Sequence, residues 1–167
     1  MIVFREILAE EKRLLDDFLY EAIFIPEGVA APPRSIIENA YLQVYVQNFG
    51  QKPDDHCLVA ECDGKVIGAV WARVMEDYGH IDDVTPSLAI SLYKEYRNQG
   101  IGSELLRRML ELLREKGYEQ VSLSVQKANY ALDMYRKAGF KVIEDKGDEV
   151  LMLCRLKSEA GHLVRGA

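Results

Sequence analysis

Hydrophobic residues recur at helical spacing in several segments of the chain, with charged residues between them. In the most regular of these segments, leucines and a methionine share one side, and Gly117 follows the last turn. An apolar stripe that ends before a glycine is typical of an amphipathic helix with a glycine cap. Three prolines and a glycine predict a loop at residues 25–33, because proline cannot donate the helical hydrogen bond. Helices are predicted at residues 10–24, 34–49, 102–116 and 129–138.

Shorter apolar runs predict the strands. Asp63-Gly64 separates two β-prone runs, and glycine accepts the positive φ of a tight turn, so these runs are predicted to form an antiparallel hairpin. The run at residues 87–92 alternates small with large side chains, which predicts a strand with one face of small residues. Because a helix and another strand follow it, a neighbouring parallel pair is also expected. The predicted strands are residues 2–7, 57–62, 66–74, 87–92, 121–125, 141–143 and 149–156.

Length and charge limit the class of protein. A chain of 167 residues, 49% of them hydrophobic, is long enough for one well-filled core. We expect a single domain over residues 1–156 and a flexible tail over residues 157–167. The net charge of −6 comes from interspersed acids and bases, without the basic patch that binds a phosphate backbone. Nucleic acid is therefore not an expected partner.

The compartment is predicted from what the sequence lacks. The first residues have no basic start followed by an apolar run, as a signal peptide would. No apolar stretch approaches the roughly 20 residues of a membrane span. The 3 cysteines form no Cys-x-x-Cys pair, which argues against a disulfide framework and against a zinc site. We expect a cytoplasmic protein with no metal and no membrane partner.

The most informative segment is residues 88–103, where a strand passes through a short polar turn into the best helix. The first turn of a helix has amide groups without internal acceptors and the positive end of the macrodipole, so it favours an anion such as a pyrophosphate. Gly100 and Gly102 lack Cβ atoms, which lets the backbone approach phosphate oxygens closely. Arg97 either adds a charge-assisted contact to the anion or braces the turn.

Two motifs in this half of the chain resemble those of a known family. The pattern Arg-x-x-Gly-x-Gly at residues 97–102 resembles the coenzyme A pyrophosphate loop of the GNAT acetyltransferases. Residues 127–140 are similar to the Asn-containing helix of the same family, with Met134 in place of the usual leucine and Gly139-Phe140 at the end. Together the two motifs cover about residues 88–140. The preceding hairpin and helices also follow the family's order.

The resemblance implies roles for individual residues. Main-chain groups of the strand would pair with the pantetheine arm, and the loop would hold the pyrophosphate. Asn129 would hold the pantetheine, cap its own helix, or do both. Tyr135 would be the general acid, since a phenol with a pKa of about 10 can protonate a thiolate whose parent thiol has a pKa of about 8.5; its alternative is a core aromatic. The expected cofactor-binding residues are Ile90, Ser91, Leu92, Arg97, Asn98, Gln99, Gly100, Ile101, Gly102, Ser103, Asn129 and Tyr135.

The general base and the acceptor are less well defined by the sequence. Some members of the family have a glutamate on the strand before the Asn helix, where this chain has Ser122 and Ser124. The base is left open among Asp82, Asp83 and Glu27, and alignment of the reactants alone is a further alternative. Direct transfer is expected, because no cysteine has a recognisable His and acid partner. The candidate acceptor-binding residues are Phe24, Glu27, Tyr41, Trp71, Asp82, Asp83 and Tyr93.

These observations combine into one prediction of fold and function. The fold is an α/β (α+β) domain resembling the GNAT fold, with a mixed, mostly antiparallel sheet of six to seven strands and about four helices. The sheet is expected to splay near Leu92 and Val125 to admit acetyl-CoA. The function is direct acetyl transfer to a primary amine of a small molecule or peptide, and a homodimer is compatible with the sequence. A non-catalytic acyl-CoA-binding or regulatory module is the first alternative, and a Rossmann-like dinucleotide site is the second.

Overall fold

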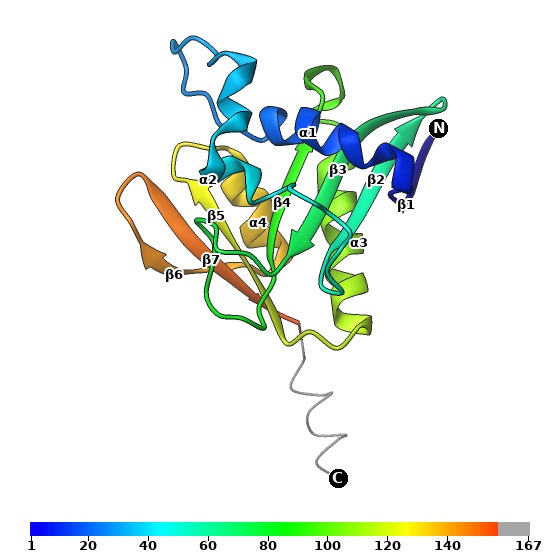
Figure 1. Cartoon of the computed structure of the whole chain (residues 1–167). Coiled ribbons are helices and arrows are strands. Elements are labelled where there is room, and N and C mark those ends of the chain that lie inside the picture. Colours follow the sequence, from blue (N-terminus) through cyan, green and yellow to red (C-terminus); the bar gives the residue numbers. More distant parts are fainter. Residues whose placement is uncertain (157–167) are drawn as a thin grey trace.

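The protein is built on one mixed sheet, which the computed structural model describes together with its helices over residues 1–156. The sheet has seven strands in the order β1-β2-β3-β4-β5-β7-β6 (Figure 1). The tail expected at residues 157–167 lies outside the described residues. The strands are β1 Ile2–Glu6, β2 His56–Cys62, β3 Lys65–Arg73, β4 Ser87–Leu92, β5 Gln120–Gln126, β6 Lys141–Asp145 and β7 Glu149–Arg155.

The strand pairing confirms the predicted mixed, mostly antiparallel sheet. Every neighbouring pair is antiparallel except β4 and β5, which are parallel and joined in sequence through a helix. Asp63 and Gly64 form the predicted β2–β3 hairpin with φ values of 51° and 82°. A Rossmann-like sheet would be largely parallel. That alternative is therefore wrong for this chain.

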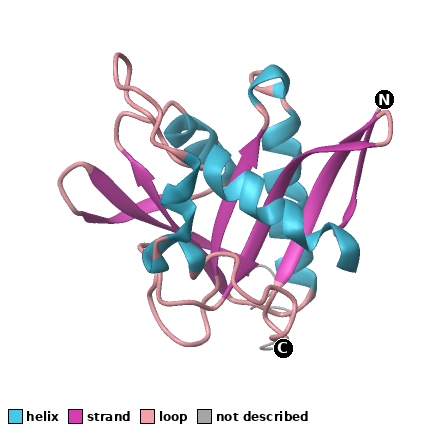
Figure 2. Ribbon diagram, turned by 45° about the horizontal axis from the view of Figure 1, so that its top comes forward, coloured by secondary structure: helices cyan, strands magenta, loops and turns pink. Residues whose placement is uncertain are grey.

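Helices cover both faces of the sheet. Helices α1 and α2 lie on one face, and α3 and α4 lie on the other (Figures 1 and 2). Among residues 1–156, no helix is long and apolar enough to cross a membrane. The α-helices are α1 Leu15–Glu21, α2 Ala40–Gln43, α3 Ile101–Glu115 and α4 Ala131–Ala138, and 3₁₀ turns occupy Ala9–Leu14, Arg34–Glu38 and Lys94–Tyr96.

The first two helices are shorter than the sequence predicts. The segment predicted at residues 10–24 begins as a 3₁₀ turn and is α-helical only over α1. The predicted helix at residues 34–49 breaks at Asn39, whose backbone is extended with ψ of 135°. The Asn39 side chain accepts a hydrogen bond from the amide of Tyr41 and so starts a separate short helix. A side chain that can cap the backbone locally competes with a continuous helix.

Two hydrophobic cores flank the sheet. Alternate residues of β2 and β3 face opposite cores, with Leu58 and Val70 in the cluster under α3 and α4, and Val59 and Trp71 in the cluster under α1. Both faces of these strands are buried, which explains why they read as nearly continuous hydrophobic runs.

The parallel strands β4 and β5 separate soon after they meet. The Cα register between them consists of the pair Ser87 and Ser122 at the start of both strands. Leu92 and Val125, at the far ends, have no partner across this gap. The splay therefore leaves main-chain groups of β4 without a neighbouring strand.

Candidate active site

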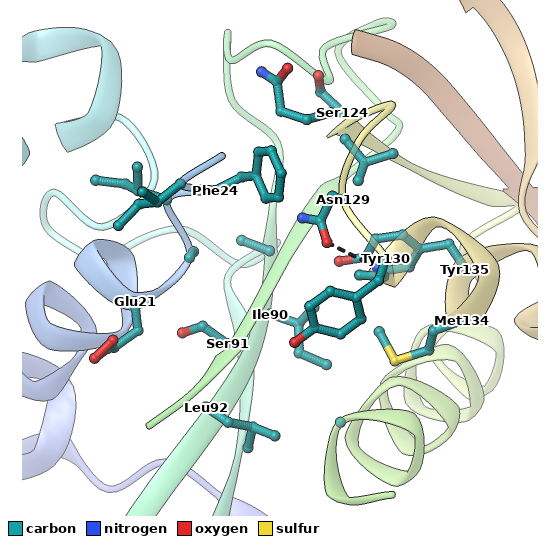
Figure 3. Close-up of a pocket in the computed structure, with 18 of the residues that line it drawn as sticks. Glu21, Phe24, Ile90, Ser91, Leu92, Ser124, Asn129, Tyr130, Met134 and Tyr135 are labelled. Atoms are coloured by element: carbon teal, nitrogen blue, oxygen red, sulfur yellow. Dashed lines mark hydrogen bonds between the residues drawn. The ribbon is translucent and has the colours of Figure 1, made fainter. Parts of the chain in front are cut away.

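A cavity of about 1240 Å³ opens where β4 and β5 separate. Its walls come from the end of α1 and the loop after it, from β4, from the start of α3, and from the end of β5 with α4 (Figure 3). Ten of the predicted cofactor-binding residues line it: Ile90, Ser91, Leu92, Arg97, Asn98, Gly100, Gly102, Ser103, Asn129 and Tyr135. Gln99 and Ile101 do not line it: the side chain of Gln99 donates a hydrogen bond to the carbonyl of Glu95, and Ile101, the first residue of α3, is buried in the core.

The turn before α3 presents backbone amides to the cavity. Gly100 is left-handed, with φ of 83°, and a Cβ added there would meet no atom within 4 Å. Asn98 is also left-handed, with φ of 62°. The first intrahelical hydrogen bond runs from the amide of Glu104 to the carbonyl of Gly100, so the amides of residues 101–103 lack acceptors within the helix. A helix start of this kind, with open space in front of it, suits a phosphate group.

Arg97 braces this turn from inside the cavity wall. Its Nε donates to the carbonyl of Leu92 at 3.1 Å, and its guanidinium also donates to the carbonyl of Glu21 at 3.1 Å. The Glu21 carboxylate lies 3.5 Å from the same guanidinium. Of the two roles considered for Arg97, these contacts favour bracing: the side chain joins the end of β4 to the end of α1.

The edge of β4 that faces β5 offers main-chain groups to the cavity, while the side chain of Ser91 is occupied by a contact with α1. The hydroxyl of Ser91 donates to the carbonyl of Phe18 at 2.6 Å, which attaches α1 to this strand. Main-chain groups of β4 that point toward β5 have no strand partner beyond the Ser87 end. An extended ligand arm can therefore hydrogen-bond along this edge as a strand would.

Tyr135 reaches the cavity from α4 on the side of the larger core. The ring packs edge-on against Phe140, with centroids 5.9 Å apart, and burial raises the pKa of the phenol. No fully buried side-chain N or O atom in residues 1–156 lacks a hydrogen-bond partner. The Tyr135 hydroxyl, which donates no hydrogen bond to these residues, therefore meets the cavity rather than the core. A protonated phenol placed there can deliver a proton to a bound group.

Asn129 caps the start of α4. Its side-chain oxygen accepts a hydrogen bond from the amide of Ala131 at 2.9 Å, and its amide nitrogen remains available to the cavity (Figure 3). The structure thus shows the capping role that the sequence offered. It leaves the donor end of the same side chain for a ligand.

Most of the candidate acceptor-binding residues lie away from this cavity, and Phe24 alone of the seven lines it. Trp71 is fully buried and donates its indole N–H to the carbonyl of Tyr45, so it offers no surface to a substrate. Tyr41 is 71% exposed. Tyr93 is half-buried and donates to the carboxylate of Asp17.

The acids proposed as bases also lie outside the cavity. The carboxylate of Asp82 accepts hydrogen bonds from the amides of Val84 and Thr85 and so orders its own loop. Asp83 lines a separate hollow beside Arg73, and Glu27 is exposed in the loop after α1.

The structure adds polar residues that the sequence did not single out. Glu21, Tyr45, Tyr78, Lys146, Asp148 and Glu149 line the cavity together with Ser124. Burial, and then the nearby charge of Asp77, raise the pKa of Tyr45. These residues come from four separate parts of the chain. No local motif marks them, because their proximity depends on which strands pair. Within residues 1–156, no group of three or more His, Cys, Asp or Glu side chains could hold a metal ion.

Comparison with known proteins agrees with this geometry. The chain is 36% identical over 86 residues to the probable N-acetyltransferase camello of Xenopus tropicalis, covering 50% of this chain and 37% of that protein. It is 32% identical over 95 residues to an N-alpha-acetyltransferase of Sulfurisphaera tokodaii, covering 52% of this chain and 56% of that protein. The chain thus spans between 37% and 56% of the lengths of these two relatives.

A solved structure shares the fold. The crystal structure of the PaiA N-acetyltransferase from Thermoplasma acidophilum in complex with coenzyme A superposes with a TM-score of 0.65. The sequence identity is 22%, and the superposition covers 93% of this chain and 99% of that one. The model of the family described as the acetyltransferase (GNAT) family matches residues 19–140. That match extends over more than half of the sequence, and the chain therefore belongs to the GNAT acetyltransferase family.

Proposed function

We propose that this protein transfers the acetyl group of acetyl-CoA directly to a primary amine. The observation that carries the proposal is the gap between β4 and β5, which opens beside the free amides at the start of α3. A pyrophosphate at these amides would place the pantetheine arm along the unpaired edge of β4. The thioester would then lie near the hydroxyl of Tyr135.

Each part of the cavity wall has a defined task in this reaction. The amides of residues 101–103 and the left-handed Gly100 bind phosphate oxygens. The edge of β4 fixes the direction of the arm and of the thioester carbonyl. As the amine nitrogen bonds to the carbonyl carbon and the carbon–sulfur bond breaks, Tyr135 donates its proton to the departing sulfur. Holding both reactants in one cavity supplies a large part of the rate, roughly 7–11 kcal/mol in well-aligned systems.

The acceptor is a cationic primary amine in this proposal. Glu21, Asp148 and Glu149 bring carboxylates to the cavity wall, and aromatic residues such as Phe24 also line it. A protonated amine attached to a small molecule or to a peptide matches this mixture of acidic and apolar groups. Similarity to an N-alpha-acetyltransferase supports peptide N-termini as one class of acceptor to test.

The proposal is tested by incubating the purified protein with acetyl-CoA and a panel of small polyamines, amino acid derivatives and peptides. We expect release of free coenzyme A thiol that depends on both the amine and the enzyme, with the acetylated amine identified by mass spectrometry. A parallel thermal-shift comparison should show stabilisation by coenzyme A and none by NAD. Stabilisation by coenzyme A without acetylation of any amine would instead favour the non-catalytic acyl-CoA-binding module. Absence of both effects would overturn the proposal.

A further inference from the structure

The three carboxylates of the cavity wall differ in their surroundings. Glu21 lies beside the Arg97 guanidinium, which holds its negative charge in an ion pair. Asp148 is exposed in the turn before β7. Glu149 is half-buried at the first position of β7, and its Oε2 accepts a hydrogen bond from the hydroxyl of Ser124 at 3.1 Å. Glu149 therefore has a fixed orientation, and among residues 1–156 no Lys, Arg or His forms an ion pair with it.

Strand geometry places Glu149 on the opposite side of the sheet from Tyr135. Val125 of β5 pairs with Val150 of β7, and both belong to the core that contains Tyr135. Neighbouring residues of a strand point to opposite faces. Ser124 and Glu149 therefore point away from that core, toward the face covered by α1 and the loop before β4. A thioester held in the gap would have the phenol on one side and this carboxylate on the other.

We propose that Glu149 is the general base of the transfer and that Ser124 is its positioning residue; the inference rests on the proposed acetyltransferase function. Glu149 takes a proton from the bound ammonium group and becomes a neutral carboxylic acid, which leaves a free amine with a lone pair. That lone pair forms the new nitrogen–carbon bond. The carbon–sulfur electrons leave with the sulfur, which takes the proton of Tyr135, and the amide nitrogen loses its second proton to solvent as the product forms.

Other charged and titratable groups surround Glu149 and define its field. Lys146 and Asp148 belong to the turn before β7, and Glu21, Lys94 and Arg97 line the same cavity from α1 and from the segment between β4 and α3. The remaining titratable groups of the lining are Tyr20, Tyr45, Tyr78, Tyr130 and Tyr135. Lys146 also donates to the carbonyl of Tyr78 at 3.5 Å, which joins the β6–β7 turn to the loop before β4.

The substitution Glu149→Gln tests the role while preserving shape and the hydrogen bond from Ser124. At neutral pH we expect kcat/KM for the amine to fall by about 100-fold or more, the usual contribution of a general base. Coenzyme A affinity should not change. The variant can use only amine that is already deprotonated. At pH values below the amine pKa, its rate should therefore increase about tenfold for each unit by which the pH is raised, while the rate of the wild type stays nearly constant. Glu144→Gln, an exposed carboxylate on β6, is the matched control and should behave as wild type.

Variants of Ser124 and the pattern of kinetic constants separate this role from its alternatives. Ser124→Ala should show an intermediate loss, which Ser124→Thr restores because threonine keeps the hydroxyl. If Glu149→Gln raises KM for the amine and leaves kcat and its pH profile unchanged, Glu149 only recognises charge and the inference is wrong. If the wild type acetylates no amine at all, the proposed function fails first. If Glu149→Gln turns over as fast as the wild type, Glu149 is not the general base, and the acetyltransferase proposal is unaffected.

Discussion

Two glycines at opposite ends of α3 allow the effect of phosphate binding to be separated from the effect of backbone strain. Gly100 precedes the helix with φ of 83°, and Gly117 follows it with φ of 92°. A Cβ at either position would meet no atom within 4 Å. The cavity contains Gly100 but not Gly117. Substitution to alanine therefore imposes the same kind of strain at both positions, and only one of them faces the proposed ligand.

The expected magnitudes follow from this arrangement. A left-handed alanine costs roughly 1–2 kcal/mol, so both variants should be less stable, and the melting temperature should fall by about 2–4 °C for each kcal/mol. At Gly100 the methyl group would also stand in open space at the wall of the cavity, where we expect it to obstruct a phosphate at the amides. Loss of one amide–phosphate hydrogen bond is worth about 1.5–3 kcal/mol, which corresponds to a Kd for coenzyme A that is about 10- to 150-fold higher.

Isothermal titration of coenzyme A into each folded variant, with thermal unfolding measured in parallel, provides the assay. We expect Gly117→Ala to lose stability but to bind with wild-type affinity, and Gly100→Ala to lose both. Wild-type affinity in Gly100→Ala would show that the start of α3 does not hold the pyrophosphate. Equal loss of affinity in both variants would show that strain, and not the position in the cavity, weakens binding.

Three further predictions concern the remaining parts of the site and its support. Tyr135→Phe should lower kcat by about 100-fold with little change in coenzyme A affinity. Because burial raises the pKa of the Tyr135 phenol above the ordinary value of about 10, the phenol keeps its proton up to that pH, and the wild-type rate should show no Tyr135-dependent loss below pH 10. A loss there that disappears in Tyr135→Phe would show that the phenol titrates lower than its burial implies, and a kcat unchanged in Tyr135→Phe would contradict the acid role. Asn129→Asp should keep the hydrogen bond that caps Ala131, and hence the stability, but should weaken coenzyme A binding. Asn129→Ala should lose that binding and also about 0.5–2 kcal/mol of unfolding free energy. Equal affinity of wild type and Asn129→Asp in titration calorimetry would exclude a ligand contact by this amide. Arg73→Leu should lower the free energy of unfolding in urea by about 3–5 kcal/mol, because it leaves the carboxylate of Asp55 buried without its partner. Arg107→Leu, on the exposed face of α3, should change this free energy little. A small effect at Arg73 would mean that water or another cation replaces the guanidinium.

Local patterns predicted the parts of the fold that depend on neighbouring residues. The Asp63-Gly64 turn, the leucine stripe of α3 and the glycine that ends α4 each carry their own signal within a few positions. The predicted helix at residues 34–49 was wrong because the apolar spacing is also satisfied by turns, and Asn39 breaks the helix with its own side chain. Apolar spacing indicates which side chains face the core, but it does not indicate whether one continuous helix connects them.

Most of the residues predicted to bind the cofactor line one cavity, whereas most of those predicted to bind the acceptor do not. The turn at Gly100 and the α4 segment with Tyr135 are continuous stretches whose residues act together. Trp71 was a candidate acceptor-binding residue, yet its strand is covered on both faces. Glu149 reaches Ser124 only because β7 lies beside β5, a pairing that the sequence pattern does not specify. Such contacts depend on the order of strands in the sheet.

The separation of β4 from β5 has a consequence for the molecule as a whole. Their register is the pair Ser87 and Ser122, so the sheet behaves as two half-sheets that touch at one corner. A pantetheine chain in the gap would supply hydrogen bonds that an eighth strand would otherwise supply. The bound donor would then join the two half-sheets, and this link would be lost each time the donor leaves. Amide hydrogen exchange along the facing edges should then slow when the donor is bound and accelerate again when the free thiol leaves.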